Sequence, residues 1–185
     1  MKQRNSGMTV VEFVVVVAVI AFLLLILLPV RSRPRRGSAQ RDNCVANLKQ
    51  LGLGIAQNYD DNTNQMPPMT SVQSLAASLA PYIGSSTRLF VCPGDRDLKP
   101  VANISNLTES SYAWIPTAVW QQSNVAVLAF DKLQPSGLTV LTGSNSWSRK
   151  SAHGGEGGCV LFTDGHAEWM RVLDVGTNRY PVVND

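Results

Sequence analysis

The chain has 185 residues, enough for one domain and one additional element, and a formal net charge of +3. Only 16% of the residues are charged, whereas about 25% is usual in soluble proteins. The positive charge does not require a nucleic-acid partner, because the arginines cluster at one end of an apolar segment and the rest of the chain is mixed.

An apolar run near the N-terminus accounts for the low charged fraction. Every residue of 13–28 is Val, Ile, Leu, Phe or Ala, so the run has no polar face and does not fit a core helix of a soluble domain. As a helix, residues 13–30 would measure about 27 Å, close to the hydrocarbon thickness of about 30 Å. A cleaved signal peptide would end at a small-x-small site, but this run ends at Pro29-Val30-Arg31. We therefore expect a retained transmembrane helix over residues 8–30.

A short basic and polar stretch, residues 1–7, precedes this helix. It ends at Gly7, which is followed by Met8. Glu12 places one carboxylate at the N-terminal end of the apolar helix, where a charge is costly. This arrangement resembles the N-terminus of type IV prepilins and of the pseudopilins of type II secretion, in which a leader ends in Gly and the fifth mature residue is Glu. Pro29 also falls at mature position twenty-two, where many pilins carry Pro.

The resemblance implies processing and assembly. A prepilin peptidase would cleave between Gly7 and Met8, remove the leader 1–7 and methylate the new amine of Met8. Glu12 would pair with the N-terminal amine of a neighbouring subunit, which in an apolar surrounding disfavours wrong registers. The resemblance also places the leader in the cytoplasm. Charge alone favours the reverse orientation, because four arginines follow the span and only Lys2 and Arg4 precede it.

The next segment, residues 31–60, is expected to continue the helix as an amphipathic part. Over Ser38 to Tyr59, apolar residues recur at helical spacing. They form a stripe of Val45, Leu48, Ile55 and Tyr59, flanked by Cys44 and Leu51. Gly52 and Gly54 weaken a helix but permit close packing. This half should lie against a globular body.

The globular domain is assigned to residues 61–185. The pattern predicts a helix over 74–82 and strands over 88–92, 111–115 and 125–130. Asp164-Gly165, between the apolar runs 158–162 and 166–172, predicts a hairpin turn, because both residues can take positive φ. The fold class is therefore α+β, with a long N-terminal helix packed on a small antiparallel sheet, as in pilins.

Several motifs sharpen the resemblance over most of the chain. His153-Gly154-Gly155 followed by Asp164-Gly165-His166 resembles the H-x9-DG signature of a pilin-like family abundant in planctomycetes, although ten residues separate His153 from Asp164 here. Two further segments resemble motifs of that family: Cys44 to Gly52, CVANLKQLG, and Leu89 to Asp95, LFVCPGD.

Three cysteines, Cys44, Cys92 and Cys159, allow at most one internal disulfide and show no close metal spacing. Spacing does not choose the pair, but the family-like motifs favour Cys44 with Cys92. Cys159 lies on an expected strand and is typical of a small core residue.

The two histidines lie near aspartates beside a glycine-rich loop. His153, Asp164, His166 and Asp131 could hold a divalent metal or support hydrolysis. The turn itself requires Asp164-Gly165, however, and His153 could simply hydrogen-bond near Asp131. We therefore expect neither a catalytic residue nor a cofactor.

We expect a structural subunit rather than an enzyme. The resemblance implies assembly into a pilus or secretion pseudopilus at the inner membrane, with the C-terminal domain outside the cytoplasm. The expected partners are prepilin peptidase, other pilin subunits and membrane lipid, with no nucleic acid. The alternatives are a non-polymerising, single-pass binding domain that holds a metal and a membrane-anchored hydrolase.

Overall fold

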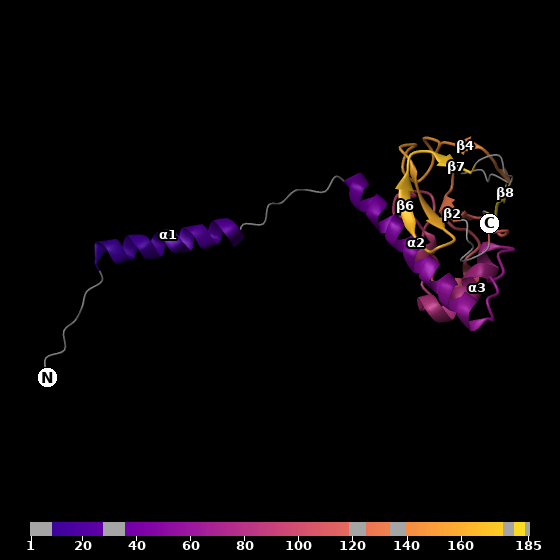
Figure 1. The fold of residues 1–185 in the computed structure, drawn as a ribbon, viewed down its shortest axis with the longest axis horizontal. Helices are drawn as coiled ribbons and strands as arrows, with labels where there is room; N and C mark the ends of the chain where they lie inside the picture. The colour runs from indigo at the N-terminus through magenta and orange to yellow at the C-terminus, as the bar shows by residue number, and fades with distance from the viewer. Residues whose placement is uncertain (1–8, 28–35, 119–124, 134–139, 176–179, 184–185) are drawn as a thin grey trace. The chain divides into compact units, whose positions relative to one another are not determined.

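A computed structural model describes residues 9–27, 36–118, 125–133, 140–175 and 180–183, drawn in colour in Figure 1. The chain divides into two compact units, Met1–Arg33 and Pro34–Asp185. The expected join between the apolar and amphipathic helices lies outside the described residues, which resume at 36.

The first unit contains one helix, α1 (Val10–Leu27). Thr9 and Glu12 close its first turn reciprocally: the Thr9 amide donates to Oε2 of Glu12 at 2.8 Å, and the Glu12 amide donates to Oγ1 of Thr9 at 3.3 Å. This is a capping box, which satisfies backbone donors that a helix start leaves open. The capping box explains why α1 begins at Val10.

None of the helices in the described part of the chain combines the length and the apolarity needed to cross a membrane. The described residues therefore do not support the expected transmembrane helix over 8–30. Met8 and residues 28–30, at its two ends, lie outside them.

The second unit begins with α2 (Arg36–Asp61), a helix slightly longer than the predicted 38–59. Its fully buried apolar side chains are Cys44, Leu48, Leu51 and Ile55, whereas Val45 and Tyr59 are only partly buried. Cys44 and Leu51 therefore lie within the buried stripe, whereas we expected them at its edges. Val45 and Tyr59, which we expected within the stripe, lie at its edges. At Gly52 an added Cβ would lie 2.9 Å from Cδ1 of Leu161 in the sheet, so this glycine permits the close packing that we expected.

A second helix, α3 (Val72–Ile83), packs against α2, and Ser71 with Ser74 forms a capping box at its start. Two short 3-10 helices follow, η1 (Thr87–Phe90) and η2 (Ile104–Asn106). The predicted strand 88–92 is thus wrong, because η1 occupies most of it. The side-chain amide of Asn47 on α2 donates to the Val91 carbonyl at 3.1 Å, so α2 rather than a strand ladder holds this segment.

The main sheet has four antiparallel strands in the order β1-β2-β5-β6. These are β1 (Tyr112–Trp114), β2 (Val127–Asp131), β5 (Gly158–Phe162) and β6 (Ala167–Met170). Helix α2 contacts β5 and β6, and Figure 1 shows it running alongside the sheet with α3 beside its far end. The architecture is therefore α+β, a helix against a small antiparallel sheet, as predicted.

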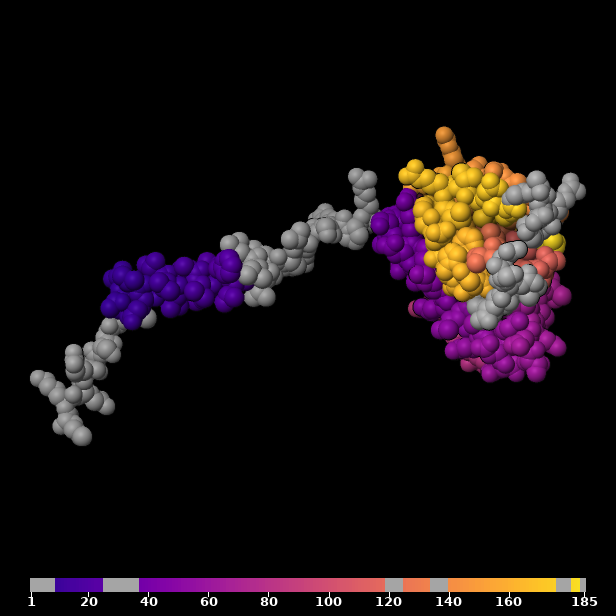
Figure 2. All heavy atoms as spheres, in the orientation of Figure 1, coloured from indigo at the N-terminus to yellow at the C-terminus, as the bar shows by residue number. Residues whose placement is uncertain are grey.

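Two smaller ladders complete the described structure. They pair β3 (Val140–Leu141) with β8 (Tyr180–Pro181) and β4 (Ser144–Asn145) with β7 (Leu173–Asp174). Figure 2 shows the surface of this unit, where α2 (purple) and the C-terminal strands (yellow) lie side by side. That contact brings the His153 loop close to α2.

Candidate functional site

The hairpin predicted from Asp164-Gly165 is present, formed by β5 and β6. Strand β5 ends at Phe162 and β6 begins at Ala167, so four residues connect them. Gly165 has φ of 86°, whereas Asp164 does not take positive φ. Asp164 instead holds the turn by accepting from the backbone amide of His166 at 3.1 Å.

Asp164 and His166 form a pair of their own on the surface. Nδ1 of His166 lies 2.5 Å from Oδ1 of Asp164, and both side chains are more than 40% exposed. The imidazole also stacks on Phe162, with ring centroids 4.2 Å apart. Burial acts to raise the pKa of Asp164, but hydrogen bonds from the backbone and ring of His166 outweigh it and lower that pKa. The geometry is that of a stabilised turn.

His153 lies in a different place, in the interior. Its side chain is only 3% exposed, and Nε2 lies 3.5 Å from Oδ2 of Asp131, whose side chain is 1% exposed. Its ring meets Trp169 of β6 edge-on at 4.8 Å between centroids. His153 and Asp164, the two ends of the segment that resembles the H-x9-DG signature, therefore lie in separate sites: His153 pairs with Asp131, and Asp164 pairs with His166.

Asp131 ends β2, the strand between β1 and β5, and several groups hold it there. Its Oδ2 accepts from the Cys159 amide of β5 at 2.6 Å, and its backbone carbonyl accepts from the Trp147 indole at 2.8 Å. The other carboxylate oxygen, Oδ1, is buried without a hydrogen-bond partner among the described residues. A buried carboxylate is costly unless it is paired, and the Cys159 amide and the His153 imidazole are the groups that contact Oδ2.

A disulfide joins Cys44 of α2 to Cys92, the pair that the family-like motifs favoured, with Cα atoms 5.1 Å apart. It adjoins the histidine, since Sγ of Cys92 lies 3.2 Å from Nε2 of His153. Gly94 makes this approach possible, because a Cβ there would come within 2.6 Å of the Ala152 carbonyl and 2.9 Å of the His153 ring. The turn 92–94 and the loop that carries His153 therefore pack closely against each other.

Cys159, the third cysteine, is buried and unpaired in the described structure. Burial, together with the carboxylate of Asp131, raises the pKa of its thiol far above the usual range. A thiol held in its protonated form is a poor nucleophile, so Cys159 serves packing, as we expected from its place on a strand.

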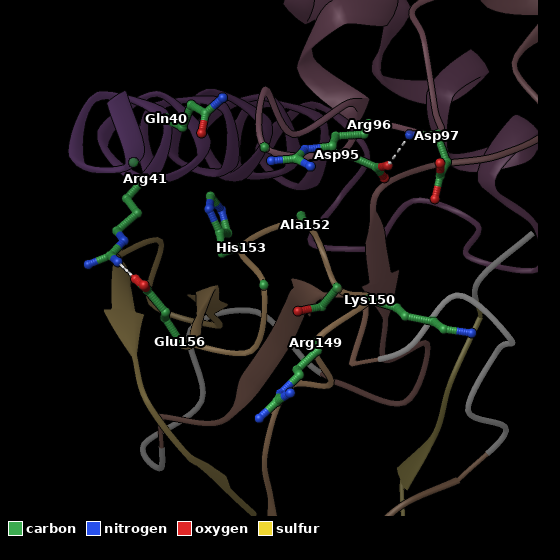
Figure 3. A pocket seen from close by; sticks show the side chains of 14 residues that line it. Gln40, Arg41, Asp95, Arg96, Asp97, Arg149, Lys150, Ala152, His153 and Glu156 are labelled. Atoms are coloured by element: carbon green, nitrogen blue, oxygen red, sulfur yellow. Dashed lines mark hydrogen bonds and ion pairs between the residues drawn. The ribbon is translucent and has the colours of Figure 1, made fainter. Parts of the chain in front are cut away.

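A pocket of about 450 Å³ opens beside His153. Its wall includes Gln40 and Arg41 of α2, Gly94, and loop residues 152–154 with Glu156. Figure 3 shows Arg41 reaching from α2 to Glu156, with which it forms an ion pair, and His153 lying between α2 and Ala152. Arg41, which lines this pocket, also lies over the ring of Trp169, with Cζ 4.5 Å from the ring centroid.

The N-terminal processing residues Gly7 and Met8 lie outside the described residues. Glu12 lies in the first turn of α1, where it completes the capping box with Thr9. The capping role was missed, although Thr-x-x-Glu directly before an apolar run is a sequence pattern typical of a helix start. The pairing of His153 with Cys92 was also missed, since no local pattern relates residues so far apart in sequence.

Comparison of the chain with protein-family models, with curated proteins and with solved structures finds no match. The function is therefore argued from the residues and their geometry.

Proposed function

We propose that this protein is a structural subunit of the pilin or pseudopilin type, which works by assembly. In this proposal a prepilin peptidase cleaves between Gly7 and Met8, and the apolar segment anchors the subunit at the inner membrane and then packs against copies of itself or related subunits. The domain from α2 onward stands outside the cytoplasm. Whether the assembly is a pilus or a secretion pseudopilus depends on its partners.

The observation that carries the proposal is the apolar surface of α1. Twelve of its large apolar side chains are exposed by between 48% and 79%, on every face of the helix. A helix that is apolar all round is stable only inside an apolar surrounding, either lipid or other helices. Glu12 is the one acidic residue of its first turn, so a neighbouring positive amine would find a single partner there.

The second unit also supports a structural role. Its helix α2 presents one face to a four-stranded antiparallel sheet, and a disulfide links α2 to the segment after η1. Such covalent tying suits a domain that works outside the reducing cytoplasm. The buried His153–Asp131 pair fits a domain stabilised from within.

Co-expression with a prepilin peptidase tests the processing step. We expect intact mass and N-terminal sequencing to show a new start at Met8, and we expect a Gly7 substitution to abolish it. A chain that still starts at Met1 beside an active peptidase would overturn the proposal.

Glu12 variants test the assembly step separately. Glu12→Gln should keep the capping box, because Gln also serves at that position, while it removes the charge that a neighbouring amine requires. We expect Glu12→Gln to enter filaments poorly and Thr9→Ala, which loses part of the cap but keeps the charge, to enter them normally. Equal incorporation of both variants would assign Glu12 to capping alone.

A non-polymerising, membrane-anchored binding domain is the second candidate. The cluster of side chains around His153 favours it, because a buried pair beside a pocket can bind a ligand. It predicts that binding is independent of Glu12.

A further inference from the structure

Four side chains with metal-binding atoms converge under the pocket. They are Cys44, Cys92, Asp131 and His153, and one candidate ligand atom from each lies within 4.8 Å of all the others. They come from α2, from the turn after η1, from the end of β2 and from the loop before β5. The fold thus assembles in space what the spacing of the cysteines does not show.

The donor set is that of a tetrahedral zinc site. Two thiolates, one imidazole and one carboxylate match the sulfur, nitrogen and oxygen ligands that Zn²⁺ accepts at distances of about 2.0–2.3 Å. Calcium and magnesium prefer oxygen ligands and would find only one carboxylate here. The chemistry of the cluster therefore selects zinc or a similar borderline metal.

In the described structure the two sulfurs are bonded to each other, so the cluster lacks its thiolates. The carboxylate is nevertheless incompletely satisfied, since Oδ1 of Asp131 is fully buried without a hydrogen-bond partner among the described residues. His153 Nε2 already points at both Cys92 Sγ and Asp131 Oδ2. Opening the disulfide would free two thiols beside the imidazole and the carboxylate, all four within one small cluster.

An access path exists on the His153 side. The pocket of about 450 Å³ is lined by His153, a member of the cluster, and by Gly94, and the rest of its wall combines charged and polar side chains with glycines and Ala152. A hydrated cation could therefore reach the imidazole before the other ligands, which are fully buried.

We propose that this cluster is a redox-controlled zinc site: with the Cys44–Cys92 disulfide reduced, Cys44, Cys92, Asp131 and His153 bind one Zn²⁺. A dithiol reductant supplies two electrons and two protons, the S–S bond breaks, two thiols form, and the reductant becomes a cyclic disulfide. Zinc then displaces both thiol protons and is held by two thiolates. This inference does not depend on the proposed function, because it concerns the second unit alone.

The test compares oxidised and reduced full-length protein in detergent. Both forms are stripped of metal, the reduced form is freed of dithiol under anaerobic conditions, and each is titrated with Co²⁺ and then Zn²⁺. We expect the reduced form alone to show thiolate-to-cobalt charge transfer and tetrahedral cobalt bands, which one equivalent of Zn²⁺ removes. After desalting, elemental analysis should find one zinc per chain in the reduced form and none in the oxidised form.

Variants distinguish this site from other metal-binding groups. Cys44→Ala/Cys92→Ala should bind no zinc although it resembles the reduced protein, and near-ultraviolet circular dichroism establishes that it is folded. His153→Gln should weaken binding at least about tenfold. The matched control, Asp164→Ala/His166→Ala, removes the exposed pair at the hairpin and should bind zinc as the wild type does. Absence of zinc from reduced wild-type protein, or zinc retained by the double cysteine variant, would overturn the proposal.

Discussion

At the scale of single residues, the His153–Asp131 pair is a contact between two side chains that are each at most 3% exposed. Oδ2 of the Asp131 carboxylate lies 2.6 Å from the Cys159 amide nitrogen and 3.5 Å from Nε2 of His153. His153→Ala would remove the imidazole from a buried carboxylate, which is strongly unfavourable.

We therefore predict that His153→Ala lowers the free energy of unfolding by about 3 kcal/mol. Urea unfolding followed by tryptophan fluorescence measures this, since Trp169 lies against the His153 ring. The control is His166→Ala, which removes the other, exposed histidine and should change stability by no more than about 0.5 kcal/mol. Equal losses in the two variants would contradict a special role for the buried pair.

The exposed Asp164–His166 pair gives a pH dependence of its own. Because the pKa of Asp164 is lower in the folded than in the unfolded chain, the unfolded chain binds more protons between the two values. The stabilisation from Asp164 is thus present above about pH 4, the ordinary Asp pKa, and is lost as the pH falls through the lower folded value.

We predict that Asp164→Asn is less stable than the wild type at pH 6 and that the difference shrinks as the pH falls below about 4. Asn keeps an acceptor for the His166 amide, so the hairpin turn should survive the change. Urea midpoints of both proteins between pH 6 and pH 3 give the comparison. A difference that stays constant over this range would show that the charge of Asp164 does not matter.

At the scale of elements, sequence reasoning succeeded where periodic patterns are long. The helices over 38–59 and 74–82 were found within two residues of α2 and α3, because apolar residues repeat there over several turns. The hairpin was found from Asp164-Gly165. The short strands β3, β4, β7 and β8 were not predicted, because a strand of two residues is too short to show an alternating pattern.

The segment 88–92 was assigned wrongly for a different reason. The apolar run Leu89, Phe90 and Val91 resembles a short strand. These residues are buried, but η1 and the disulfide from Cys92 to Cys44 hold the segment in place instead of strand pairing. The partner of His153 was equally beyond local patterns. The sequence placed His153 near Asp131 as one option, but only the packing of α2 on β5 brings Cys92 into that contact.

The disulfide is the main covalent tie between α2 and the rest of the second unit. It closes a loop of 48 residues that contains α3 and η1. In the chain-entropy account, closing a loop of this length stabilises the fold by about 4 kcal/mol, mainly by restricting the unfolded chain.

We predict that Cys44→Ser/Cys92→Ser lowers the free energy of unfolding by about 2–4 kcal/mol in metal-free buffer. The measurement is urea unfolding of the oxidised wild type, the dithiol-reduced wild type and the double variant. Reduced wild type and variant should agree. Cys159→Ala is the control for removing a thiol that closes no loop, and dithiol should destabilise it as much as it does the wild type.

At the scale of the whole molecule, the contacts of the chain fall within two units, Met1–Arg33 and Pro34–Asp185. Among the described residues, the buried core belongs to the second unit, from Cys44 to Leu173, whereas twelve large apolar side chains of α1 are exposed. If the proposed function holds, stability and assembly are separable, because the core lies in the second unit and the exposed apolar surface lies on α1.

We predict that a chain beginning at Pro34 folds and is monomeric in water without detergent. Its free energy of unfolding should match that of the second unit in the detergent-held full chain within about 1 kcal/mol, because no core side chain is removed. Sedimentation measures the association, and near-ultraviolet circular dichroism with urea unfolding measures the fold. The full chain transferred to water should associate instead, because association buries the apolar side chains that α1 exposes. A truncated chain that unfolds or still associates would show that the two units depend on each other, and assembly would then have to involve the surface of α2 and the sheet.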